Sequence, residues 1–247
     1  MTDDPFPVFT ADHWPDAWPE GLEGAVFVLD KPLGWSSFRL VGLMRKLLDI
    51  RKVGHAGTLD PLASGVLIVA VGRATKQIDR FMAEDKRYEA RIRFGYSTPS
   101  FDSETQADAT APWEHITPAS VDAVLTDRFT GWIEQVPPVY SAVKINGVPA
   151  YKKARIGQVV AVKPRMVHIR NARVTNAALP EITVDISCGK GTYIRSLAYD
   201  LGLALDSRAT LTGLVRTEIG PWRLSSAIGL PTLLRTFDPD GKTGLPR

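Results

Sequence analysis

The chain has 247 residues, of which 44% are hydrophobic and 23% charged, and its formal net charge is +3. These values are typical of a globular protein with one large domain, and the one cysteine, Cys188, excludes an internal disulfide and a multi-cysteine zinc site. No apolar run reaches about 18 residues and no signal peptide is recognisable, so we expect a cytoplasmic protein that makes no contact with a membrane.

The two ends of the chain differ in composition from the rest. Residues 1–21 carry acids, prolines and tryptophans but no Lys or Arg, so we expect an irregular arm, which aromatic residues such as Phe9 and Trp14 could fix to the body. The main domain is expected at 22–230 and a short tail at 231–247.

Hydrophobic periodicity and turn residues predict alternating strands and helices along the main domain. In chain order, the expected elements are a strand at 24–29, a helix capped by Ser36 or Ser37, a turn at Asp60 with a strand at 66–71, a short helix at 74–86, an alternating strand at 87–95, a polar loop at 97–115, a helix at 118–129, strands near 159–162, 166–175 and 181–189, a helix at 193–205 capped by Thr192, and a last strand near 209–222.

This order indicates an α+β fold in which a mixed sheet is flanked by helices. Cys188 alternates with the apolar residues of its strand, so we expect it in the core.

One carboxylate, Asp60, lies in a glycine-rich turn between a basic segment and a covered strand. Pro61 stiffens this turn, and Gly57 and Gly65 allow backbone angles that other residues resist. An Asp-Pro pair is usually a simple turn in which the carboxylate caps nearby N–H groups. A rigid acid beside a core strand also fits a catalytic site, and the turn alone does not decide between these interpretations.

Two further residues stand out from their surroundings. Arg195 falls in the first turn of its expected helix, where the helix dipole disfavours a cation by about 0.3–1 kcal/mol. A carboxylate or phosphate partner would explain it, and so would an arginine that reaches back to solvent. Tyr88 begins the apolar face of its strand and is either a core tyrosine or one wall of a base pocket.

Positive charge is concentrated in residues 135–180, which hold eight Lys or Arg residues and no acid. Such segregation is typical of a polyanion-binding surface, although a solvated basic face has the same composition. Tyr140 and Tyr151 lie among these cations and offer stacking surfaces, which favours RNA over a regular duplex groove.

Four segments together resemble a known family: LDKPLGWSS (29–37), GHAGTLDPLASGVL (54–67), DKRYEARIRFG (85–95) and CGKGTYIRSLAYDLG (188–202). In this order and spacing they are similar to the TruB family of tRNA pseudouridine synthases, which modify uridine 55 in the TΨC arm. The segment PPVYSAVKINGVPAYKKARIG (137–157) matches the substrate-facing insert of that family. The resemblance implies the pseudouridine synthase fold, a mixed and mostly antiparallel sheet flanked by helices, with a basic RNA-facing insert at about 135–175.

The resemblance also implies a role for individual residues. Asp60 would be the nucleophile on a flipped-out uridine, Arg195 would pair with it, Tyr88 would line the pocket, and His55 would fill the space that the flipped base leaves. No cofactor and no metal are implied. The other residues expected to contact RNA or substrate are Lys31, Lys144, Lys152, Lys153, Lys190, Tyr193 and Leu214.

The chain departs from the family pattern in two places. After the Tyr88 strand the family often has an acidic Thr-Asp-Thr-like segment, whereas here the sequence is STPSFDS, in which Asp102 keeps the later acid. Many bacterial relatives continue into an RNA-binding PUA domain, and we expect none here.

The resemblance implies a tRNA partner, the TΨC stem-loop, and no obligatory protein partner. Two alternatives to a stand-alone tRNA enzyme are the catalytic subunit of a guide-RNA-directed complex and a non-catalytic tRNA-folding chaperone. A missing PUA domain argues against the first. The joint presence of Asp60, Tyr88 and Arg195 argues against the second.

Overall fold

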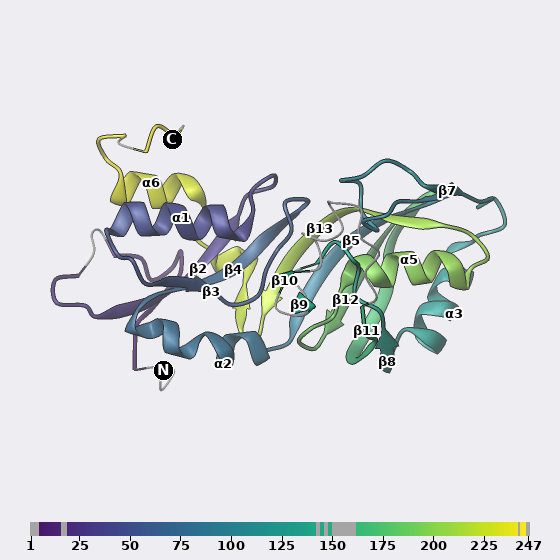
Figure 1. The fold of residues 1–247 in the computed structure, drawn as a ribbon, viewed down its shortest axis with the longest axis horizontal. Helices are drawn as coiled ribbons and strands as arrows, with labels where there is room; N and C mark the ends of the chain where they lie inside the picture. The colour runs from purple at the N-terminus through teal and green to yellow at the C-terminus, as the bar shows by residue number, and fades with distance from the viewer. Residues whose placement is uncertain are drawn as a thin grey trace. The chain divides into compact units, whose positions relative to one another are not determined.

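The computed structural model forms two compact units (Figure 1). The first unit contains Met1–Lys86 and Val215–Arg247, and the second contains Arg87–Leu214. No helix in the described part of the chain is long and apolar enough to cross a membrane. The structure describes residues 5–15, 19–141, 144–145, 148–149, 162–241 and 243–245.

The first unit is built on a mixed sheet. Strand β2 (Gly24–Lys31) runs antiparallel to β4 (Ala63–Gly72), β3 (Val53–His55) is antiparallel to β4, and β1 (Val8–Phe9) is parallel to β2. The short strand β14 (Trp222–Arg223) pairs with the end of β13 (Ala209–Ile219). Most residues of β2 and β4 are buried, because apolar clusters cover both faces of these strands.

Helices cover the two faces of this sheet (Figure 1). Helices α1 (Ser37–Leu48) and α6 (Leu230–Phe237) lie side by side and bury their apolar residues against one face. The 3-10 turn η1 (Arg73–Gln77) leads into α2 (Ile78–Ala83), which covers the other face with Phe81. A second 3-10 turn, η2 (Leu224–Ser226), precedes α6.

Part of the acidic N-terminal arm packs into this core. Phe9 and Trp14 lie against Phe27, and Trp14 also meets Phe237 of α6 edge to face. The Trp14 indole N–H donates to Thr236 Oγ1 at 2.8 Å. The aromatic residues of the arm therefore fix it to the first unit.

The second unit has the strand order β5 (Lys86–Phe94), β12 (Glu181–Cys188), β11 (Arg165–Ala178), β8 (Gly131–Gln135). Strand β11 is antiparallel to both of its neighbours. Short pairs are formed by β6 (Tyr96–Ser97) with β7 (Ala109–Thr110) and by β9 (Lys144–Ile145) with β10 (Val148–Pro149).

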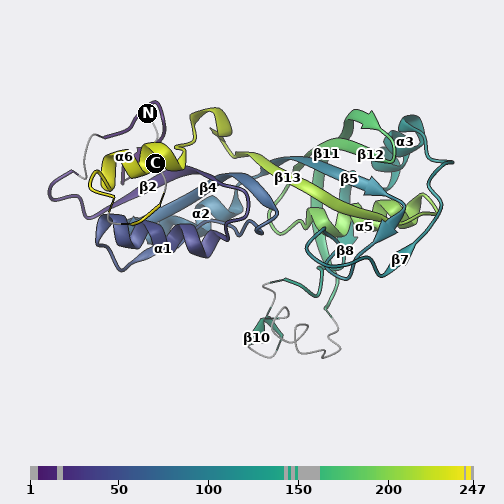
Figure 2. The same ribbon diagram turned by 90° about the horizontal axis from the view of Figure 1, so that it is seen from above.

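Helix α3 (Pro118–Arg128) lies against β11 and against α5 (Ile194–Ala204), as Figures 1 and 2 show. Helix α5 buries Leu197, Ala198 and Leu201.

The sequence-based expectation of a mixed, mostly antiparallel sheet with flanking helices is confirmed, and so are the Ser36 cap and the buried Cys188. The segment 97–115 is a polar loop as expected, apart from the short strands β6 and β7, and the buried Ser100 and Asp102 side chains within it are hydrogen-bonded to each other. The expected Thr192 cap is wrong: α5 starts after Tyr193, and the Thr192 hydroxyl donates to the Gly189 carbonyl instead. The strand expected near 159–162 lies largely outside the described residues.

Candidate active site

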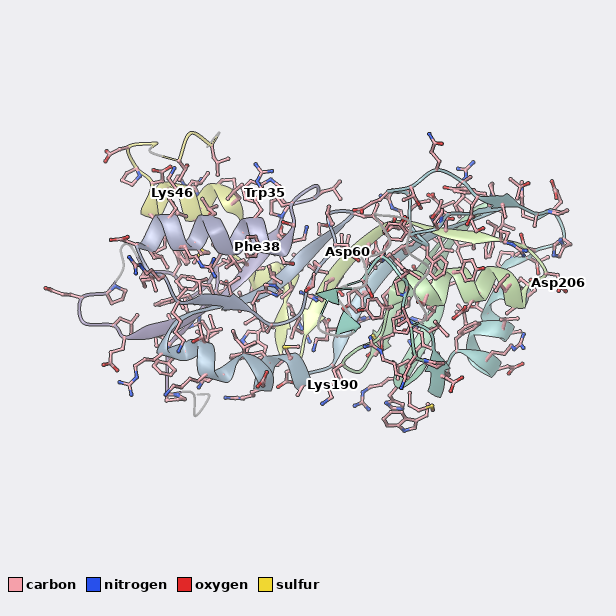
Figure 3. The ribbon with its side chains drawn as sticks, in the orientation of Figure 1. Trp35, Phe38, Lys46, Asp60, Lys190 and Asp206 are labelled. Atoms are coloured by element: carbon pink, nitrogen blue, oxygen red, sulfur yellow. The ribbon has the colours of Figure 1, made fainter. Side chains whose placement is uncertain are left out.

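The Asp60 turn connects β3 and β4 of the first unit, and Figure 3 labels its carboxylate. Gly57 and Gly65 flank the turn with φ of +95° and +99°, backbone angles that L side chains rarely adopt. The Ala63 N–H donates to the Asp60 carbonyl at 3.0 Å and closes the turn. The glycines therefore have the conformational role that the sequence suggested.

The loop before α1 and the start of that helix hold this turn from one side. The Ser37 hydroxyl accepts the Leu59 N–H at 2.8 Å and lies 3.1 Å from the Leu59 carbonyl, to which it donates. The Gly34 N–H donates to the Pro61 carbonyl at 2.8 Å. Residues on both sides of Asp60 are thus fixed by buried or backbone hydrogen bonds.

Arg216 holds the turn from the other side. Its side chain is 1% exposed, and it donates from Nε to the Val66 carbonyl at 2.7 Å and from Nη2 to the Gly57 carbonyl at 3.2 Å. A buried guanidinium that bonds carbonyls on both sides of the turn restricts the position of Asp60. The sequence patterns above do not single out Arg216, although an arginine within the otherwise largely apolar strand expected near 209–222 is a signal for it.

His55 lies at the end of β3 and is half-buried. Burial lowers the pKa of its imidazole, and the positive charge of Arg216 lowers this pKa further. The ring is therefore neutral near pH 7, which suits a side chain that fills the space of a base.

Lys31 lies at the end of β2 and is fully buried. Its ammonium donates to the carbonyls of Pro32 and Trp35. This geometry favours a role in shaping the loop beside Asp60 over the direct contact with RNA that the resemblance implied.

Arg195 forms the centre of a polar cluster in the second unit. Its Nη1 lies 3.4 Å from Asp102 Oδ2 and donates to the Ser100 carbonyl at 3.0 Å, and its Nη2 donates to the Tyr140 carbonyl at 2.9 Å. A carboxylate was one of the partners that the sequence left open for this cation, and the structure places Asp102 there. The pairing of Arg195 with Asp60 stays a prediction.

The segment that carries Asp102 is held in an uncommon conformation. Phe101 has a φ of +63° and stacks on Tyr199 of α5 with ring centroids 4.0 Å apart. Ser100 Oγ donates to Asp102 Oδ1 at 2.6 Å, and the Glu104 N–H donates to the same oxygen at 3.0 Å. The other carboxylate oxygen, Oδ2, faces Arg195.

A buried glutamine fixes the start of α5. The Tyr193 N–H donates to Gln135 Oε1 at 2.7 Å, and Gln135 Nε2 donates to the Tyr193 carbonyl at 3.0 Å. Ser196 Oγ donates to the Val136 carbonyl at 2.7 Å. These bonds attach α5, and with it Arg195, to the end of β8.

The remaining predicted residues of the second unit have different environments. Tyr88 on β5 is 8% exposed, Leu214 on β13 is half-buried, and Lys190 is exposed. The Arg165 guanidinium lies over the Tyr193 ring, 4.7 Å from its centroid. The side chain of Lys144 and both Lys152 and Lys153 lie outside the described residues. Within the described parts of the chain, no cluster of His, Cys, Asp and Glu could hold a metal ion.

Solved structures define the class of this fold. A crystal structure of a Cbf5–Nop10–Gar1 complex contains a chain that matches with a TM-score of 0.68 and 27% identity, over 99% of this chain and 63% of that chain. A crystal structure of an archaeal box H/ACA Nop10–Cbf5 complex matches with a TM-score of 0.64 and 26% identity, over 94% of this chain and 60% of that chain. This chain thus spans less than two thirds of either, and its fold is that of the pseudouridine synthases.

Sequence comparison identifies the family within this class. Residues 45–194 match the model of the TruB family pseudouridylate synthase, N-terminal domain. A tRNA pseudouridine synthase B of Bacteroides fragilis is 49% identical over 83% of this chain and 91% of its own length. A relative with the same name from Thermobifida fusca is 43% identical over 87% of this chain and 76% of its own length. The chain belongs to the TruB family of pseudouridylate synthases and is an isomerase.

Proposed function

We propose that this protein converts uridine 55 in the TΨC arm of tRNA into pseudouridine, with Asp60 as the nucleophile. The names of its relatives support tRNA as the substrate. The observation that carries the assignment of Asp60 is the rigidity of its turn, which Ser37 and Arg216 hold from two sides.

The reaction rearranges one nucleoside without adding or removing an atom. The bond between N1 and C1′ breaks, the base rotates, and a bond forms between C5 and C1′. The proton on C5 leaves and N1 gains one, so the sum of protons is unchanged. No oxidant, hydrolytic water or group donor is consumed, which fits a site whose proposed residues are an acid, a phenol, a guanidinium and an imidazole.

Three routes use the same carboxylate. Asp60 attacks C6 of the base, attacks C1′ of the sugar, or assists elimination to a glycal. Each route needs the target base out of its stack, at a cost of about a few kcal/mol. A carboxylate that is already fixed loses little entropy when the base arrives, and this favours reaction.

The other assigned residues suit these steps. Tyr88 is nearly buried at the start of an apolar strand face, as expected of a pocket wall that could also transfer a proton. A neutral His55 can occupy the place of the flipped uracil without adding charge to the base stack. Arg195, fixed by Asp102, completes the proposed catalytic set.

The test is chemical mapping of pseudouridine in an unmodified tRNA transcript after incubation with the protein. We expect Asp60→Asn to lower the rate by at least about 10³-fold, as when a covalent nucleophile is removed. Asp79→Asn, an exposed carboxylate on α2, is the matched control and should act at the wild-type rate. Full activity of Asp60→Asn would contradict the nucleophile assignment. No product with the wild-type protein would favour a non-catalytic tRNA chaperone.

A further inference from the structure

The outward face of α1 combines an exposed aromatic ring with positive charge. Phe38 is 71% exposed, and Arg39, Arg45 and Lys46 are exposed on the same helix. Figure 3 labels Phe38 and Lys46 on this helix. No acidic residue occurs between residues 31 and 48, although a helix N-terminus ordinarily favours acids. All charged side chains of α1 are therefore basic.

Gly42 lies in the middle of this face. A Cβ added there would meet no atom within 4 Å, so packing within the protein does not require glycine at this position. Glycine in a helix interior lowers stability relative to alanine. One use for such a glycine is to let a bound chain approach the helix backbone closely, and here basic residues lie on both sides of it.

The aromatic residues near the start of α1 differ in their availability. The Arg39 guanidinium lies over the Trp35 ring, 3.9 Å from its centroid, so one face of that indole is already covered. The Arg45 guanidinium lies farther from the Phe38 ring, 5.9 Å from its centroid, and Phe38 is 71% exposed, although a large apolar side chain gains nothing from contact with solvent. An exposed ring beside cations is the combination that binds the bases and phosphates of an RNA strand.

This face begins beside the proposed catalytic turn. Ser37 is the first residue of α1, and its hydroxyl is bonded to Leu59, the neighbour of Asp60 in sequence. The 12 residues of the helix extend for about 18 Å from that point. A strand whose uridine reaches Asp60 can therefore continue along α1 without leaving the first unit.

We propose that the outward face of α1, formed by Phe38, Arg39, Gly42, Arg45 and Lys46, binds the RNA substrate outside the target uridine, with its cations at phosphates and Phe38 against an unpaired base. The proposal rests on the proposed function for the identity of that RNA as tRNA. Charge complementarity favours a polyanion, and the exposed ring favours one that carries bases. The predicted basic insert is a separate part of the chain, so this face adds a second group of RNA contacts.

The decisive comparison uses two substitutions that add the same charge. Gly42→Glu places a carboxylate in the middle of the proposed face, and Ala123→Glu places one on the exposed side of α3. We expect Gly42→Glu to weaken binding of a tRNA transcript about fivefold at low salt, as expected from one unfavourable charge pair. Ala123→Glu should bind with wild-type affinity. Thermal unfolding of both variants confirms that each is folded.

Two substitutions that each remove one proposed contact with RNA test the same face. Phe38→Ala should weaken binding at every salt concentration, because stacking is not screened. Lys46→Gln should lower the slope of log affinity against log salt by about one, whereas the slope should change less in Lys76→Gln, an exposed control on η1.

Equal tRNA affinities of Gly42→Glu and Ala123→Glu would overturn the proposal and leave α1 as a solvated face or a dock for an acidic protein. Pseudouridine formation by the wild-type protein, followed in parallel, tests the proposed function separately, because the affinity ratio of the two variants does not depend on turnover.

Discussion

Arg195 Nη1 and Asp102 Oδ2 lie 3.4 Å apart, and both side chains are almost completely buried. The pair joins α5 to the segment that follows β6, two parts of the second unit that are distant in sequence. Buried charges are stable in such a place only when each is compensated. The Ser100 and Tyr140 carbonyls accept hydrogen bonds from Nη1 and Nη2 of the cation.

Removal of the Asp102 carboxylate should therefore lower the stability of the fold. We expect Asp102→Ala to lower the free energy of unfolding by about 3–5 kcal/mol, because the buried Arg195 charge loses the Asp102 carboxylate. Urea unfolding measures the effect, and Asp127→Ala, at an exposed position on α3, is the matched control, with an expected loss below about 1 kcal/mol. Similar losses in the two variants would show that the Arg195–Asp102 pair does not stabilise the fold.

Local patterns predicted most of the elements correctly. The covered strand β4 follows from an unbroken apolar run, and the start of α1 follows from Ser36, whose hydroxyl accepts the Arg39 N–H at 3.1 Å. Both signals act between residues that are close in sequence, so a single sequence contains them.

Contacts between distant residues were not predictable in the same way. The segment around Asp102 looks like a solvated loop because its residues are polar, and its burial depends on hydrogen bonds among Ser100, Asp102 and Glu104. The sequence predicts Thr192 as the cap of α5, whereas in the structure Gln135 at the end of β8 bonds the start of this helix. Neither hydrophobicity nor spacing reveals such partners.

Substitution of Gln135 tests whether its two hydrogen bonds to the Tyr193 backbone, here called the Gln135 clamp, position helix α5. Gln135→Leu removes both bonds to Tyr193, so we expect a loss of about 1–3 kcal/mol in the free energy of unfolding and a lower kcat, because α5 carries Arg195. Gln106→Leu, an exposed position, should leave both quantities near wild type. A Leu variant with wild-type kcat and stability would rule out the clamp.

The stability of the protein should depend on pH through Asp200. Burial raises the pKa of this α5 carboxyl to about 6, whereas its ordinary value is 3.8. Between these values the folded chain keeps a proton that the unfolded chain has released, so stability falls as pH rises from about 4 to 6. The charged form is destabilising at pH 7.

We therefore expect Asp200→Asn to raise the free energy of unfolding at pH 7 by about 1 kcal/mol, after allowance for the water around a partly exposed carboxylate, and to have little effect at pH 4. Asp206→Asn, labelled in Figure 3 and exposed just after α5, is the control and should show no such difference between the two pH values. Urea unfolding at both pH values measures the free energy of unfolding of each variant. An equal effect of Asp200→Asn at pH 4 and pH 7 would contradict the raised pKa of Asp200.

Two glycines beside the proposed catalytic turn separate backbone strain from steric clash. Gly34 has a φ of +79° and a Cβ there would meet nothing within 4 Å, whereas Gly65 has a φ of +99° and a Cβ would lie 2.3 Å from the Arg216 carbonyl oxygen. Gly34→Ala should therefore cost about 1–2 kcal/mol, the penalty of an unfavourable φ alone. Gly65→Ala should cost at least about twice as much and also lower kcat, because the clash displaces Arg216 from the carbonyls of the Asp60 turn to which it donates.

Thermal unfolding and single-turnover kinetics measure the two effects. Equal losses in the two variants would mean that the turn can move away from Arg216 at little cost, and the rigidity assigned to Asp60 would then be wrong.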